Sequence, residues 1–143
     1  MEWSWKKGTA TTSADFGNPV TTDGQTLCVC GGPGVPDVLY RARVTPGGTC
    51  ATKPCWTTTA SGAHQYKNAL ANPDGVVALK LVPGADGKAQ IKAKLTRPDL
   101  LLPLLPVALP VTVQRRSDTG ACWTASHSVA TKNTTTKLVA KGE

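Results

Sequence analysis

Two histidines and one cysteine are the side chains of this sequence best suited to acid–base or nucleophilic chemistry. The imidazoles of His64 and His127 change charge near neutral pH, which suits them to act as a general base. A carboxylate such as Asp74 or Asp118 can orient such a ring, and the pair can then activate a serine or a cysteine. Cys30, just before a glycine-rich stretch, is the candidate thiol. This set predicts a small hydrolase that cleaves an ester or a phosphoester.

The spacing of residues 122–128 limits what His127 can do. Alternate residues of a strand point to opposite faces, so His127 shares its face with Trp123. Ser126 and Ser128 point the other way and cannot be its nucleophile. The alternative for both histidines is an ordinary side chain, hydrogen-bonded or exposed, with no part in catalysis.

Sequence motifs give the commoner enzyme classes no support. The chain has no H-E-x-x-H, G-x-S-x-G, Walker A or dinucleotide-binding signature. Residues 31–34 are rich in glycine but lack the Lys-Ser/Thr pair of a phosphate-binding loop, and a turn explains them. Cys28 and Cys30 do not form a CxxC knuckle, which disfavours a zinc site with His127. We therefore expect neither a metal nor a cofactor.

Five cysteines in 143 residues indicate disulfides and an oxidising compartment. Cys50 and Cys55 bracket a short loop and can close locally. That leaves Cys28 or Cys30 to reach Cys122. The first residues lack a basic region followed by an apolar one, so we expect the signal peptide to be absent from this chain. No run of about 18 uncharged apolar residues exists to span a membrane. The expected location is extracellular or periplasmic.

The elements that must position these side chains are strands. Residues 76–82 (VVALKLV) and 88–95 (KAQIKAKL) flank an Asp-Gly turn, which is the composition of a β-hairpin. In the second segment the lysines and Gln90 face one way, whereas Ile91 and Leu95 face the other. The pattern predicts a strand with one wet face and one dry face, with Ile91 and Leu95 buried.

Further short strands are expected on both sides of this hairpin, in segments 25–30, 37–44, 55–60, 63–67, 111–116, 121–128 and 134–140. The prolines of residues 100–110 favour an extended crossover, or else an exposed apolar patch that contacts lipid or a partner. Eight or nine strands predict an all-β fold, either an antiparallel β-sandwich or a closed barrel, tied by disulfides. Residues 25–143 form this single domain, and residues 1–24 are interpreted as an irregular leader or a weak first strand.

The order of several segments invites a comparison. From residue 25 to the end these are TLCV, PGGTC, KPCW, PDG, GADGKAQIKAK, LPLLPVALPVTVQ and GACWTASHS. Together they resemble a recurrent C-terminal module of uncharacterised secreted bacterial proteins. The Leu-Pro stretch before VTVQ and the later CW are the most specific pieces. No activity is established for that group, so the resemblance implies export and a disulfide-tied β domain, and it implies no reaction.

The resemblance also bears on the cysteines. Four of them match cysteine positions of the module: Cys28, Cys50, Cys55 and Cys122. To choose among the pairings left open, we use the resemblance, which implies one bridge between Cys50 and Cys55. It implies a second between Cys28 and Cys122, which leaves Cys30 free. Cys30 and both histidines stand where the module is expected to have other residues.

The charge and the aromatic residues bear on partners. A formal net charge of +7 is spread along the chain, which favours a soluble charged surface over a polyanionic partner. Exposed tryptophans can stack on sugar rings, but Trp56 and Trp123 each follow a cysteine and are expected to pack in the core. Few aromatic residues alternate with basic ones, which disfavours nucleic acid. The leading prediction is a secreted, non-catalytic module that binds an extracellular polysaccharide or surface, and the small hydrolase is the alternative.

Overall fold

The computed structural model describes residues 1–32, 37–96 and 106–141, and it is all-β apart from one short 3-10 helix, η1 (Ala14–Phe16). The larger sheet has seven strands, in the order β12 (Lys132–Asn133), β13 (Leu138–Lys141), β1 (Glu2–Gly8), β9 (Ala89–Leu95), β8 (Val76–Val82), β7 (His64–Lys67) and β6 (Trp56–Thr58). The smaller has four, in the order β11 (Cys122–His127), β10 (Val111–Ser117), β2 (Gln25–Gly31) and β3 (Asp37–Val44). Strands β4 (Thr49–Cys50) and β5 (Lys53–Pro54) pair separately.

The expected all-β class is confirmed, but the closed barrel is wrong. Among the described residues both larger sheets have edges, at β12 and β6 in one and at β11 and β3 in the other. The described residues form 13 strands instead of eight or nine. The excess comes partly from pairs as short as two residues, such as β4 and β5, which have too few side chains to show a period. Of the strand pairs that the structure describes, all are antiparallel except β1 with β13.

The first strand has a central place that its sequence does not suggest. Residues 2–8, within the segment interpreted as a leader or a weak strand, pair with β9 on one side and β13 on the other. The β8–β9 hairpin is confirmed, with Leu81 opposite Ile91 and Val76 opposite Leu95. Ile91 and Leu95 are 0% and 1% exposed, as their alternation with lysines requires.

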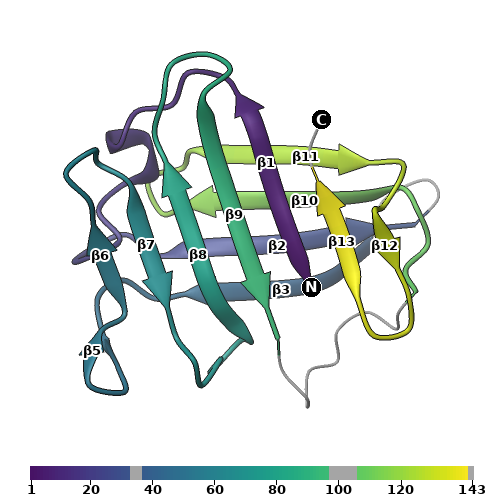
Figure 1. Cartoon of the computed structure of the whole chain (residues 1–143), viewed down its shortest axis with the longest axis horizontal. Coiled ribbons are helices and arrows are strands. Elements are labelled where there is room, and N and C mark those ends of the chain that lie inside the picture. Colours follow the sequence, from purple (N-terminus) through teal and green to yellow (C-terminus); the bar gives the residue numbers. More distant parts are fainter. Residues whose placement is uncertain (33–36, 97–105, 142–143) are drawn as a thin grey trace.

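A single hydrophobic cluster draws side chains from both larger sheets. Trp3 and Ile91 enter it from the seven-stranded sheet, and Val29 and Val113 enter it from the four-stranded sheet. Figure 1 shows β2, β3, β10 and β11 running across the strands of the larger sheet, behind them in this view. On the other face of the larger sheet, the lysines of β9 that alternate with Ile91 and Leu95 are exposed.

Two sequence predictions cannot be followed through the whole of their segments. Most of the proline-rich crossover at 100–110 lies outside the described residues, and so does part of the glycine-rich turn at 31–34. Within the described ranges, no helix has the length and apolar character needed to cross a bilayer.

Candidate functional site

His64 of β7 lies in a hydroxyl-rich, buried site that resembles a catalytic triad only in outline. Its Nε2 is 3.2 Å from the hydroxyl of Ser13 and its Nδ1 is 2.9 Å from that of Thr58. Ser13 donates its proton to the carbonyl of Gly62 at 2.9 Å, so the serine is left to accept from Nε2. A hydroxyl stands where a triad has a carboxylate. Burial lowers the pKa of His64, which favours the neutral ring.

His127 of β11 points into the core. Its Nε2 accepts a hydrogen bond of 3.1 Å from the indole N–H of Trp3, which joins the two larger sheets. Opposite it on β10 is Val111, which is fully buried. Cys30 of β2 instead pairs with Thr112, the next residue of β10, and so lies on the opposite face of the sheet. Cys30 and His127 therefore do not line one cleft.

The two carboxylates suggested as partners lie beside Arg43 and not beside a histidine. Asp118 accepts two hydrogen bonds from the Arg43 guanidinium, at 3.0 and 2.7 Å, and this contact lowers its pKa. Asp74 accepts from the backbone N–H of Arg43 at 2.8 Å. The residues suggested for a hydrolase are thus dispersed, and the geometry does not assemble them into a catalytic group.

Of the two expected disulfides, the one between Cys50 and Cys55 is confirmed and the one between Cys28 and Cys122 is not formed. Cys50 and Cys55 form a disulfide, whereas Cys28, Cys30 and Cys122 are free thiols. Cys28 lies opposite Gln114 and Cys122 lies opposite Arg116, on strands that flank β10 on its two sides. Two strand spacings amount to about 9.6 Å, beyond the roughly 7 Å limit for the Cα atoms of a disulfide. The bridge between Cys28 and Cys122 implied by the resemblance is therefore wrong.

The free thiols share the outer face of the four-stranded sheet. Burial raises the pKa of Cys28, which disfavours its thiolate. Among the described residues, no group of three or more histidines, cysteines and acidic side chains is placed to hold a metal ion.

A cationic cleft lies on the solvent-facing side of the seven-stranded sheet. It has a volume of about 380 Å³ and is crossed by a row of directly opposed residues. The row runs from Ser4 of β1 through Lys92 of β9 and Lys80 of β8 to Gln65 of β7. Because adjacent strands are about 4.8 Å apart, the two ammonium groups extend from neighbouring positions.

Charge of one sign dominates this cleft, which we call the lysine cleft. Its lining contains five lysines, all exposed: Lys6, Lys67, Lys80, Lys92 and Lys94. Among the described lining residues Glu2 is the single carboxylate, and it lies 3.7 Å from the ammonium of Lys137, a residue outside the lining. Like charges directly opposite each other on a sheet destabilise it. A bound anion would relieve that repulsion.

Only part of this cleft can be predicted from the sequence. The alternation of residues 88–95 assigns Lys92 and Lys94 to a wet face, as observed. It does not show that Lys80 lies opposite Lys92, because that depends on strand register. Lys6 and Lys67 come from strands far away in the chain, and no local signal links them.

A scan against protein-family models, a search of curated proteins and a search of solved structures each found no match to this chain.

Proposed function

We propose that this chain is an exported, non-catalytic β-sandwich module that binds an acidic polysaccharide in the lysine cleft. The observation that carries the proposal is the opposed pair Lys80 and Lys92 in a cleft whose one carboxylate, in the described part of the chain, is next to Lys137. Export is supported by the Cys50–Cys55 disulfide and by the resemblance to a module of secreted bacterial proteins. Two larger sheets that share one core support the sandwich arrangement.

The chemistry of the cleft favours a sugar polymer over nucleic acid. Single-stranded nucleic acid is bound by stacking its bases on exposed aromatic rings. The aromatic residues that line the cleft, Trp3 and Tyr66, are 2% and 7% exposed, with their rings in the core. The hydroxyl of Ser4 and the carboxamide of Gln65 stand at the two ends of the lysine row, where they can hydrogen-bond sugar hydroxyls. Lysine ammonium groups between them match carboxylate or sulfate groups on the polymer.

Titration calorimetry with polygalacturonate, at several salt concentrations, tests the proposal. We expect binding that weakens as salt rises, and no binding of neutral dextran. Lys80→Gln combined with Lys92→Gln should weaken binding by on the order of tenfold, since two exposed charge contacts contribute up to about 1.4 kcal/mol together. The matched control is Lys88→Gln with Lys132→Gln, which removes two exposed lysines outside the cleft lining.

Three results would overturn the proposal. The first is no binding of polygalacturonate even at low salt. The second is an equal loss of affinity in the control variant, which would show attraction to net charge alone. The third is tighter binding of a single-stranded oligonucleotide, with the same dependence on Lys80 and Lys92, which would assign the cleft to nucleic acid.

A further inference from the structure

We infer that the lysine cleft continues into a second subsite beside the disulfide, and that this subsite takes an O-acyl group carried by the acidic polysaccharide. The inference rests on the proposed function and names the ligand more closely. A second cleft, of about 480 Å³, lies next to the Cys50–Cys55 bridge. Gln65 and Lys67 of β7 line both clefts. A polymer that lies along the lysine row and extends beyond β7 therefore reaches the disulfide.

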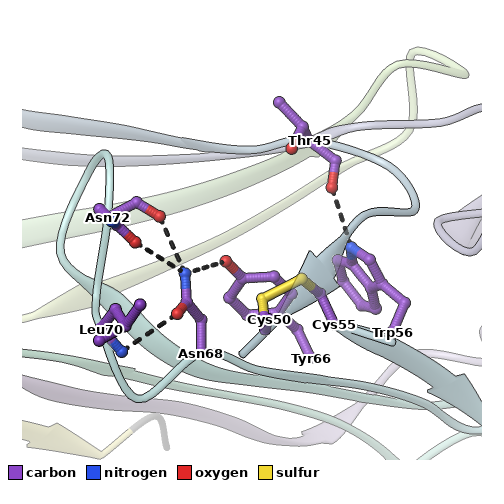
Figure 2. Close-up of a disulfide and its surroundings, with 8 residues drawn as sticks. All are labelled: Thr45, Cys50, Cys55, Trp56, Tyr66, Asn68, Leu70 and Asn72. Carbon is purple, nitrogen blue, oxygen red and sulfur yellow. Dashed lines mark hydrogen bonds between the residues drawn. A yellow bond between two sulfur atoms is a disulfide. The ribbon is translucent and has the colours of Figure 1, made fainter. Parts of the chain in front are cut away.

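The walls of this second subsite are held in place by internal hydrogen bonds. On one side, the backbone N–H of Lys67 donates to the carbonyl of Cys55 at 2.9 Å. On the other, the carboxamide of Asn68 donates to the hydroxyl of Tyr66 and the carbonyl of Asn72, and accepts from the N–H of Leu70 (Figure 2). A site fixed in this way does not have to be ordered when a ligand binds.

Part of the lining of the second subsite is apolar. Leu70 is 68% exposed, and an isolated exposed leucine is ordinary on a protein surface. Here it shares a hollow with the disulfide, Ala69 and Pro54. The carboxamide of Asn68 is occupied by the loop contacts. The apolar surface suits a methyl group, such as that of an acetyl ester.

Positive charge continues into the same hollow. Lys53 and Lys67 line it and are exposed. The acidic backbone of the polymer thus keeps cationic neighbours while its acyl group contacts Leu70. An uncharged acylated sugar would lack this attraction, so the class of ligand is an O-acetylated acidic polysaccharide.

Oligogalacturonates of two lengths, each with and without O-acetylation, test the inference. For the full chain we expect long oligomers to bind more tightly than disaccharides, and acetylation to add about fourfold to the affinity of long oligomers, which corresponds to one buried methyl-sized group. Leu70→Ser should abolish the gain from acetylation. Val129→Ser, which alters a side chain 76% exposed and outside both linings, is the matched control and should keep the gain.

The bridge itself supplies a second test. Cys50→Ser with Cys55→Ser should reduce the advantage of long oligomers without changing disaccharide affinity, with circular dichroism confirming the fold. A gain from acetylation that survives Leu70→Ser would overturn the inference, and so would an affinity that does not depend on length or acetylation. If disaccharides still bind through Lys80 and Lys92 in that case, only the second subsite fails. If no oligomer binds, the proposed function fails as well.

Discussion

The guanidinium carbon of Arg115 lies 4.3 Å from the ring centre of Trp123, and 5.1 Å from that of Phe16, inside the core. The side chain is 0% exposed, and its three nitrogens have no hydrogen-bond partner among the described residues. Burial lowers the pKa of Arg115 to about 9, so the group is still a cation at neutral pH. The rings attract that charge, but a buried cation that forms no ion pair with the described residues is costly.

Replacing this cation should therefore stabilise the protein. Arg115→Met keeps an apolar chain against both rings and removes the buried charge, so we expect the free energy of unfolding in urea to rise by about 1 to 4 kcal/mol. Arg116→Met changes the exposed next residue of β10 and should stay within about 0.5 kcal/mol of the wild type. A loss of stability in Arg115→Met would show that the charge has a compensating partner in solution.

The β8–β9 hairpin allows a comparison of neighbouring residues. Ile91 is fully buried, so Ile91→Asp should lower the free energy of unfolding by roughly 3 kcal/mol or more. Lys92 is exposed and opposite Lys80, so Lys92→Asp creates an attractive cross-strand pair and should change stability by less than about 1 kcal/mol. Urea denaturation of both variants measures this, and similar effects would contradict the register.

Thiol labelling distinguishes the observed cysteine pairing from the one implied by the resemblance. In the unreduced, denatured protein, mass spectrometry of peptides should find label on Cys28, Cys30 and Cys122, and none on Cys50 or Cys55. In the native protein the exposed Cys122 should react first. Cys28 should react more slowly, because burial raises its pKa and reduces its thiolate fraction. Label on Cys30 alone would restore the bridge between Cys28 and Cys122.

His64 should make the protein less stable in mild acid. Its folded-state pKa is lowered below the ordinary value of 6.5 by burial. As the pH falls below 6.5, the unfolded chain takes up a proton before the folded one does, so the free energy of unfolding decreases until the folded pKa is passed. Urea denaturation between about pH 8 and pH 5 should show this decrease. His64→Gln keeps hydrogen-bonding groups for Ser13 and Thr58 but has no imidazole to titrate, so the loss of stability in acid should be smaller. If the loss is the same in this variant, another group causes it.

Local alternation was enough to predict the strands that have a wet face and a dry face. Residues 37–44 and 76–82 form β3 and β8 with the bounds expected from their sequence. Alternation also placed His127 correctly away from Ser126, on the face of Trp123. Such patterns are local, because side chains of a strand alternate whatever its neighbours are.

Features that depend on which strands are neighbours could not be predicted from the sequence. Cys28 and Cys122 were paired through a resemblance, and only the position of β10 between their strands shows that they are too far apart. Residues 2–8 have tryptophans on one face, but their place between β9 and β13 comes from pairing across most of the chain. The lysine cleft has the same origin, since Lys80 meets Lys92 only in the folded register.

The position of β1 also has a consequence for how the chain is made. Its two neighbours are β9, residues 89–95, and β13, residues 138–141, so β1 is synthesised long before either of its partners. Until β13 arrives, one side of β1 presents unpaired backbone groups, to which a strand of another nascent copy can pair. Pairings this distant in sequence also slow folding. We therefore expect newly synthesised chains to be most prone to strand exchange and aggregation before β13 has left the ribosome.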